Sequence, residues 1–397
     1  MTLTCADCMP ERVLVYVHVP FCVRKCRYCA FVSHVYSPDA ADRYLTLLER
    51  EMAVWAERYG CLCADTVYVG GGTPSLLTPK QVTWLFDALE RFFDLGQTRE
   101  VSMEANPESV CAPGFLETAR DRGVSRISLG VQSLHDATLR LLGRPHDRQT
   151  VVRAVRAVRD AGISSLNLDL IWGVPGQNLN MWLDDVRQAI ALEPEHLSCY
   201  GLSLEHGTLL LDQVMRQELH MPSEDCASQM FVRGCQSVEE AGFAQYEISN
   251  FARHGHMCQH NLGYWAGSSY AGLGPAAVST MSGMRWTNAS ALDDYARGLA
   301  AGVSGQDVEL LTSHVQAREM IMLSLRTRAG LDLEWFQAKT GCDFLRHTGS
   351  FIEQLCASDL AQVSSNHFSL TRQGMLVSDS ILATLLEYVD HVTGDIL

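Results

Sequence analysis

Short apolar runs alternate with amphipathic stretches over roughly the first half of this chain. The first run, residues 13–19 (VLVYVHV), is rich in β-branched residues and ends at Pro20, a pattern typical of a buried strand. Comparable runs predict further strands at residues 66–69, 100–104, 126–129, 166–171 and 196–200. Stretches with apolar residues at helical spacing separate these runs.

Start signals mark several of the intervening helices. Ser37 followed by Pro38 indicates one helix start, because proline suits the first helical position. Thr78, Pro79 and Gln81 have the arrangement of a capping box at a second start. Further helices are expected near residues 113–122, 149–161 and 181–192. Six strands that alternate with helices predict an α/β fold with a parallel sheet and right-handed crossovers.

The pattern changes after about residue 244. Residues 250–283 are rich in glycine, serine, histidine and aromatic residues, which predicts a long functional loop region. From Ser313 onward helices dominate, with one short strand near His367–Leu370. We therefore expect three parts: a core domain of βα units (1–244), a connecting segment (245–310) and a small, mostly helical C-terminal domain with a wing (311–397).

Composition narrows the function classes. The chain has 46 acidic and 31 basic residues and a net charge of −15, which argues against a general nucleic-acid binder. No apolar run is long enough for a stable membrane span, although peripheral association stays open, and the first residues lack the apolar core of a signal peptide. We expect a cytoplasmic protein, in which the 14 cysteines serve as thiols, metal ligands or core residues rather than disulfides.

Three cysteines follow the first strand with the spacing C-x3-C-x2-C: Cys22, Cys26 and Cys29. Closely spaced thiolates on a loop can hold an iron–sulfur cluster, and three ligands for four irons leave one iron open to another ligand. The alternative is buried or zinc-binding cysteines, but zinc usually takes paired C-x2-C motifs or added histidines. Cys5 and Cys8, before the first strand, could bind metal or belong to a disordered tail.

A second group of residues follows the later strands. Residues 70–74 (GGGTP) come after the second strand, where glycines let the backbone approach a ligand closely, although a plain βα turn would look the same. Glu104, Gln132, Arg144 and Asp169 lie near the ends of successive strands or helices. Each alone reads as a generic polar residue, but ligands gather at the carboxyl ends of parallel strands.

The cysteine spacing resembles that of the radical S-adenosylmethionine (SAM) superfamily. This resemblance implies a partial (β/α)6 barrel, a [4Fe–4S] cluster on the three cysteines, and S-adenosylmethionine bound at the open iron. In that family, electron transfer into the sulfonium gives methionine and a 5′-deoxyadenosyl radical. The residues implied to contact S-adenosylmethionine are Tyr16, Tyr28, Gly71, Gly72, Thr73, Glu104, Gln132, Arg144 and Asp169.

The segments YVHVPFCVRKCRYCAF, SMEANPES, RISLGVQS, LGRPH and DLIWGVPGQ resemble the coproporphyrinogen-oxidase-like branch of this superfamily. The branch contains oxygen-independent coproporphyrinogen III oxidases, which form protoporphyrinogen IX, and haem chaperones. Three features favour the chaperones. Phe31 stands where the oxidase has a fourth cysteine, the first strand begins near residue 13 rather than after an extension, and HNLGYW (residues 260–265) matches the chaperones' HNxxYW motif.

The HNxxYW motif also has a chemical interpretation. Haem iron accepts an axial imidazole or thiolate, which His260 or Cys258 could supply. Tyr264 and Trp265 could cover the porphyrin face. The alternative is a structural histidine beside core aromatic residues. The resulting hypothesis is a haem chaperone with haem as cargo; acceptor haem proteins, an electron donor and a second copy of the chain would be its partners.

Overall fold

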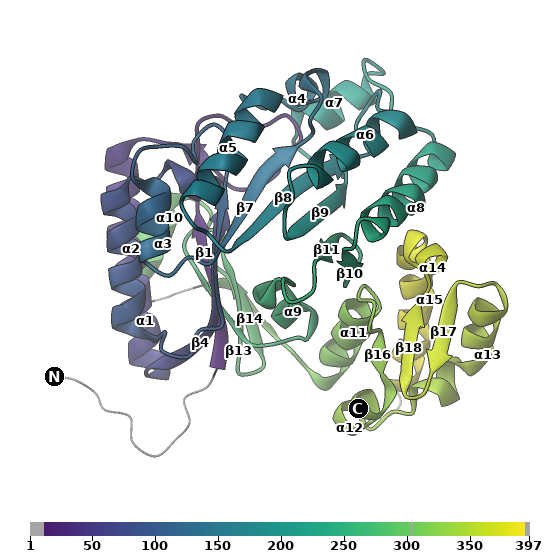
Figure 1. The fold of residues 1–397 in the computed structure, drawn as a ribbon. Helices are drawn as coiled ribbons and strands as arrows, with labels where there is room; N and C mark the ends of the chain where they lie inside the picture. Colours follow the sequence, from purple (N-terminus) through teal and green to yellow (C-terminus); the bar gives the residue numbers. More distant parts are fainter. Residues whose placement is uncertain (1–11, 303–304, 394–397) are drawn as a thin grey trace.

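The computed structural model describes residues 12–302 and 305–393 (Figure 1). Cys5 and Cys8 lie outside these residues. The predicted strands form the centre of a 13-stranded sheet, in the order β9-β8-β7-β6-β4-β1, and every neighbouring pair is parallel. Their bounds are β1 (Arg12–Val19), β4 (Leu62–Gly71), β6 (Glu100–Ala105), β7 (Arg126–Gln132), β8 (Ser165–Trp172) and β9 (His196–Gly201). The ends of the sheet do not pair, so the barrel is partial, as predicted.

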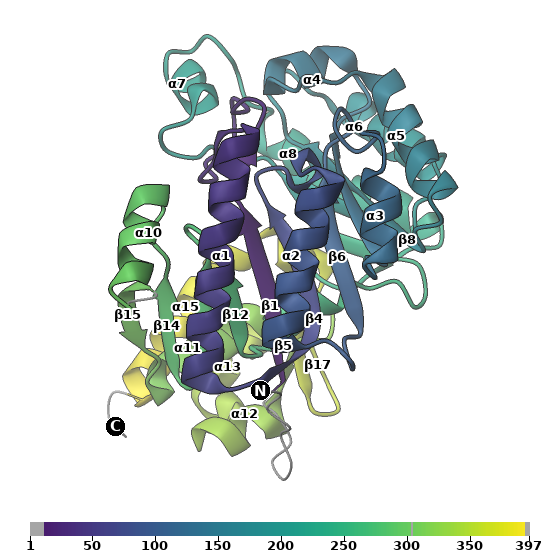
Figure 2. The same ribbon diagram turned by 90° about the vertical axis from the view of Figure 1, so that its left-hand side faces the viewer.

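Helices cover the outer face of this sheet (Figures 1 and 2). They are α1 (Pro38–Tyr59), α2 (Pro79–Phe92), α3 (Phe115–Asp121), α5 (Arg148–Asp160), α6 (Leu179–Ile190) and α8 (Glu224–Glu240). Two short helices, α4 (Asp136–Leu142) and α7 (Leu209–Met215), lie instead at the top of the view in Figure 1. The Ser37 hydroxyl accepts from the Ala40 backbone N–H, and both hydrogen bonds of the Thr78–Gln81 capping box are present. These two predicted helix starts are therefore confirmed.

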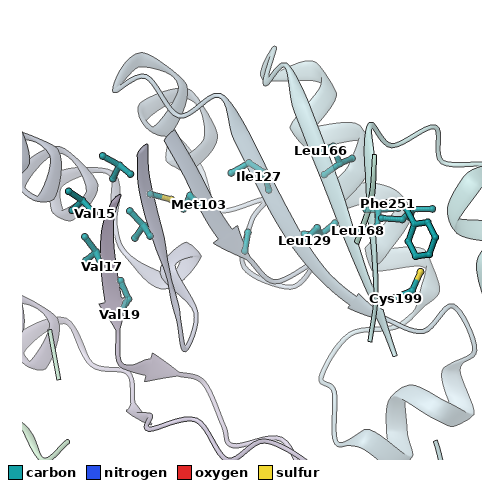
Figure 3. Close-up of a cluster of buried hydrophobic side chains, with 14 of the residues drawn as sticks. Val15, Val17, Val19, Met103, Ile127, Leu129, Leu166, Leu168, Cys199 and Phe251 are labelled. Atoms are coloured by element: carbon teal, nitrogen blue, oxygen red, sulfur yellow. The ribbon is translucent and has the colours of Figure 1, made fainter. Parts of the chain in front are cut away.

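Side chains along each strand alternate between the helix-covered face of the sheet and the interior of the barrel. Val15, Val17 and Val19 of β1 face the helices and are fully buried, as are Ile127 of β7 and Leu168 of β8 (Figure 3). The intervening positions face the barrel interior and are largely polar: Tyr16, His18, Thr66, Tyr68, Glu104, Ser128, Asn167, Asp169, His196 and Ser198. Since successive side chains of a strand point to opposite faces, one strand can supply both the core and a polar interior.

The prediction of a long loop at residues 250–283 is wrong. This stretch contains β11 (Asn250–Ala252), α9 (Gln259–Trp265), β12 (Tyr270–Leu273) and β13 (Val278–Met281). β12 pairs in parallel with β1, and β13, β14 (Met284–Thr287) and β15 (Gln306–Leu310) extend the sheet in antiparallel order. A Cβ on Gly272 would come within 2.0 Å of the Val278 carbonyl oxygen, so this glycine allows close strand packing rather than marking a loop.

The C-terminal part is mostly helical, as predicted. It contains α11 (Ser313–Ser324), α12 (Leu333–Thr340), α13 (Phe344–Ala357), α14 (Arg372–Leu376) and α15 (Ser378–Thr393). The predicted strand is present as β18 (His367–Leu370), in a small sheet with β17 (Ala361–Ser364) and β16 (Leu331–Asp332). The backbone N–H of Arg328 donates to the Tyr246 carbonyl at 3.0 Å, which ties this part to the barrel. Across the described ranges, no helix combines the length and apolar character needed to span a membrane.

A buried carboxylate ties α1 to the extended end of the sheet. Glu51 accepts hydrogen bonds from the Gly274 N–H (2.7 Å), the Asn288 amide (2.6 Å) and the Tyr295 hydroxyl of α10 (Leu292–Ala300). Burial raises its pKa from the ordinary 4.5 to about 7. Because the folded-state pKa lies above the unfolded value, this group stabilises the fold most below the ordinary carboxyl pKa, and that contribution is lost as pH rises through about 7.

We therefore expect the melting temperature of wild type to fall between about pH 5 and pH 8, and Glu51→Gln to flatten that fall. The pH-dependent part is up to roughly 3 kcal/mol, since one pKa unit corresponds to about 1.4 kcal/mol. The melting temperature of Glu51→Gln should still fall somewhat with pH, because burial also raises the pKa of Glu104 and Glu247. Glu57→Gln, at an exposed position of the same helix, is the control. If the melting temperature of Glu51→Gln fell with pH as steeply as that of wild type, Glu51 would not be a source of the pH dependence.

Candidate functional site

The cysteine loop forms one wall of a cavity of about 580 Å³ at the carboxyl ends of the parallel strands. Cys22, Cys26 and Cys29 all line this cavity. The loop is closed at its base by the parallel pairing of β2 (Phe21–Cys22) with β3 (His34–Val35). Its centre is anchored by the Arg27 N–H, which donates to the Leu142 carbonyl at 3.1 Å. The structure thus brings the three predicted cluster ligands together at the mouth of the barrel.

The surroundings of the thiols suit thiolate ligands. Arg144 Nη1 donates to Cys26 Sγ at 3.4 Å, and Thr73 Oγ1 donates to Cys22 Sγ at 3.6 Å. Burial, with the neighbouring Cys26 and Cys22, raises the pKa of the free Cys29 thiol, so this ligand would lose its proton on binding iron. Within residues 12–302 and 305–393, no three His, Cys, Asp or Glu side chains converge as ligands of a single metal ion. A cubane binds each thiolate at a different iron, so this donor set fits a [4Fe–4S] cluster.

The glycine segment lies beside the start of the cysteine loop. Gly71 has φ of 105°, a conformation that favours glycine. A Cβ on Gly72 would lie 2.5 Å from the Phe21 carbonyl oxygen, so the segment packs directly against the strand that carries Cys22. The backbone N–H of Gly71 donates to Glu104 Oε2 at 3.0 Å. The backbone of this segment is therefore exposed to the cavity and held in register by Glu104.

Two carboxylates project into the cavity, Glu104 from β6 and Asp169 from β8, the two strands that flank β7. Glu104 Oε1 accepts from the Tyr68 hydroxyl at 2.9 Å, and burial, with Asp169 adding to it, raises the Glu104 pKa to about 7. Asp169 accepts from Ser128 Oγ at 3.1 Å and from Asn167 Nδ2 at 2.7 Å, while burial raises its pKa. Both carboxylates keep acceptor capacity toward the cavity, which suits hydroxyl groups of a ligand.

A buried guanidinium completes the cavity. Arg144 Nη2 donates to the Gly130 carbonyl at 3.0 Å and to Asn106 Oδ1. Its Nε is buried and has no hydrogen-bond partner among the described residues, so one donor of this guanidinium is left unsatisfied. The Asn106 amide also donates to Thr73 Oγ1 at 2.9 Å and thereby links Arg144 to the glycine segment. Sequence reasoning missed Asn106 and Tyr68, although Asn106 follows Glu104 by two residues.

Eight of the nine residues predicted to contact S-adenosylmethionine line this cavity: Tyr28, Gly71, Gly72, Thr73, Glu104, Gln132, Arg144 and Asp169. Gln132 has a positive φ of 65° at an irregularity in the pairing of β7 with β8. Tyr16 does not line the cavity. It lies deeper in the barrel, where its hydroxyl pairs with His18 Nδ1 at 3.1 Å and it lines a second, smaller cavity of about 200 Å³. The two cavities share Tyr68, Ser128 and Tyr200.

The HNxxYW motif lies away from the cysteine loop. It forms α9, which closes the lower end of the barrel and places His260 beside the smaller cavity with 2% of its surface exposed. His260 Nδ1 pairs with Thr66 Oγ1 at 2.7 Å, and its ring lies 5.1 Å from that of Tyr68. Burial lowers its pKa to about 3, so the imidazole is neutral. Its Nε2 is buried without a partner in the described part of the chain.

The other residues predicted to bind haem lie in α9 or at its start. Cys258 is buried, and its thiol donates to Glu100 Oε1 at 3.2 Å. Tyr264 packs edge-on against His260, with ring centroids 4.8 Å apart, and both Tyr264 and Trp265 are partly exposed. The cavity beside them is smaller than the roughly 300–1,000 Å³ of typical ligand pockets. Ligation of haem iron by His260 would therefore require α9 to leave the barrel.

Family models match two parts of the chain. Residues 16–189 match the radical SAM superfamily, and residues 311–377 match the HemN C-terminal domain. The chain also superposes on the solved structure of coproporphyrinogen III oxidase (HemN) from Escherichia coli, with a TM-score of 0.81 over 96% of this chain and 90% of that one. At 22% sequence identity, this match shows a shared fold.

Similarity to heme chaperones extends over nearly the whole chain. Heme chaperone HemW of Mycobacterium tuberculosis (strain ATCC 25618 / H37Rv) is 36% identical over 378 residues, which covers 94% of each chain. Heme chaperone HemW of Bacillus subtilis (strain 168) is 32% identical over 373 residues, covering 94% of this chain and 98% of that one. These relatives span both the barrel and the C-terminal part.

Proposed function

Because the chain belongs to the HemW family of radical SAM proteins, we propose that it is a haem chaperone, which binds haem and passes it to acceptor haem proteins. The observation that carries this proposal is similarity to heme chaperones over 94% of the chain. Phe31 agrees with it, because the sequence lacks the fourth cysteine of the related oxidases at this position.

The 580 Å³ cavity at the mouth of the barrel, called the mouth cavity below, offers a cofactor site that agrees with this proposal. Cys22, Cys26 and Cys29 would hold a [4Fe–4S] cluster, which supplies one-electron chemistry when bound. The S-adenosylmethionine carboxylate suits the unpartnered Nε of Arg144, which is buried and positively charged. Glu104 and Asp169 would accept hydrogen bonds from ribose hydroxyls. The buried apolar shell behind Tyr28, formed by Leu142, Ile171 and Val174, limits the access of water from that side.

His260 and Cys258 remain the residues predicted from sequence as haem ligands. Because both residues are buried, a porphyrin could reach them only if α9 moved away from the barrel. Neither residue contributes to the mouth cavity. The proposed function does not depend on which of the two regions holds haem.

We expect the anaerobically reconstituted protein to bind haem with a saturable Soret change and to lose that haem to an acceptor apoprotein. We also expect no protoporphyrinogen IX when coproporphyrinogen III, S-adenosylmethionine and a reductant are supplied. Absorbance titration measures the first result and chromatography of porphyrins the second. Stoichiometric formation of protoporphyrinogen IX and 5′-deoxyadenosine would overturn the chaperone assignment in favour of oxidative decarboxylation. Denatured protein is the control for nonspecific haem uptake.

A further inference from the structure

The rim of the mouth cavity exposes apolar side chains from two segments. On the cysteine loop, Val23 is 55% and Phe31 63% exposed; on α7, Leu209 is 50% and Met215 75% exposed. The two segments touch, because the Leu210 N–H donates to the Arg27 carbonyl at 2.9 Å, and Figure 2 shows α7 beside the loop. Exposed apolar side chains on adjacent segments indicate a binding surface.

The cysteine-loop side of the rim carries unpaired positive charge, whereas the exposed Glu205 lines the cavity on the α7 side. The chain has a net charge of −15, yet residues 21–36 contain no aspartate or glutamate and include Arg24, Lys25 and Arg27. All three cations are exposed, and none belongs to an ion pair among the described residues. Arg24 and Lys25 also line the cavity. An occupant should therefore combine a large apolar face with negative charge.

Haem has this combination, since it is a planar apolar ring with two propionate groups on one edge. We propose that haem docks on this rim, with its porphyrin face against Phe31 and Val23 and its propionates paired with Arg24 and Lys25. This inference rests on the proposed haem-chaperone function and gives it a site. A phenylalanine ring offers a large contact area to a porphyrin, and the two cations offer charge-assisted hydrogen bonds to carboxylates.

The rim is preferred to the interior because it needs no rearrangement of the barrel. The interior cavity measures about 200 Å³, and His260, which lines it, is only 2% exposed and is hydrogen-bonded to Thr66 of β4. By contrast, Phe31 and Val23 already line the open side of the 580 Å³ mouth cavity. Exposed imidazoles that can serve as axial ligands are present on both segments, His34 in β3 and His206 just before α7.

The test compares haem affinity in rim variants of the full chain after anaerobic cluster reconstitution. We expect Phe31→Asp, and separately the double variant Arg24→Glu/Lys25→Glu, to raise the haem Kd by about tenfold or more in Soret titrations. Val308→Asp, at a similarly exposed valine of β15, controls for the aspartate. Arg50→Glu/Lys80→Glu, at exposed sites on α1 and α2, matches the change in net charge. Both controls should bind haem as wild type does.

The possible outcomes separate this inference from the proposed function. If wild type binds no haem, both fall. If wild type binds haem and both rim variants match their controls, the rim site is overturned while the chaperone function stands. Loss of the Soret change in His260→Ala alone would then assign haem to the interior. If the charge reversal only slows reduction of the cluster by a protein electron donor, the rim is a docking surface for that donor, and the haem site is overturned.

Discussion

Cys26→Ala is expected to abolish retention of the four-iron cluster. The three cysteines that line the cavity would be the whole protein ligand set of the cluster, so the loss of one would leave two irons without a protein ligand. The substitution also removes the sulfur that accepts from Arg144 Nη1 at 3.4 Å, which leaves a buried guanidinium with fewer acceptors. Iron and acid-labile sulfide measured after anaerobic reconstitution should fall from roughly four of each per chain to near zero.

Cys356→Ala provides the matched control, because Cys356 is exposed on α13 in the C-terminal part. Its iron and sulfide content should equal that of wild type. Cys22→Ala and Cys29→Ala should lose the cluster as Cys26→Ala does. A normal cluster in any of the three variants would remove that cysteine from the ligand set.

Gly72→Ala is expected to destabilise the fold and to abolish S-adenosylmethionine binding. The new Cβ would meet backbone rather than a flexible side chain, with the Phe21 carbonyl oxygen at 2.5 Å and its backbone nitrogen at 2.9 Å. Either the glycine segment or the start of the cysteine loop must therefore move. Such overpacking typically costs about 1–3 kcal/mol. Thermal unfolding measures the loss of stability, and equilibrium binding of S-adenosylmethionine to reconstituted protein measures the loss of the site.

Gly349→Ala is the control for this substitution. Gly349 lies inside α13, and a Cβ there would have no neighbour within 4 Å. Alanine is the better helix former, so this variant should gain up to about 1 kcal/mol and bind the cofactor normally. Wild-type affinity in Gly72→Ala would mean that the glycine segment can shift without disturbing the cavity, and would contradict its role as a cradle.

Local signals in the sequence determined the central strands, two helix starts and the cysteine loop. The apolar run of β1 and the capping box at Thr78 involve residues within one strand or one helical turn. Both elements can therefore be predicted without knowledge of tertiary contacts. The spacing of Cys22, Cys26 and Cys29 placed all three on one short loop. The polar residues at strand ends then met in one cavity, because the carboxyl ends of parallel strands share one edge of the sheet.

Tertiary structure alone decided how deep in the barrel each polar residue lies and which segments far apart in sequence join. β12 pairs with β1 across about 250 residues of chain, and no local pattern specifies that partner. Tyr16 and Tyr68 occupy neighbouring strands, yet only Tyr68 reaches Glu104. The HNxxYW motif was expected in a long loop but forms a helix, with His260 buried, at the opposite end of the barrel from the cysteines. Hydrophobic periodicity in the sequence shows which face of a helix or strand is apolar. Long-range packing decides which other element covers that face.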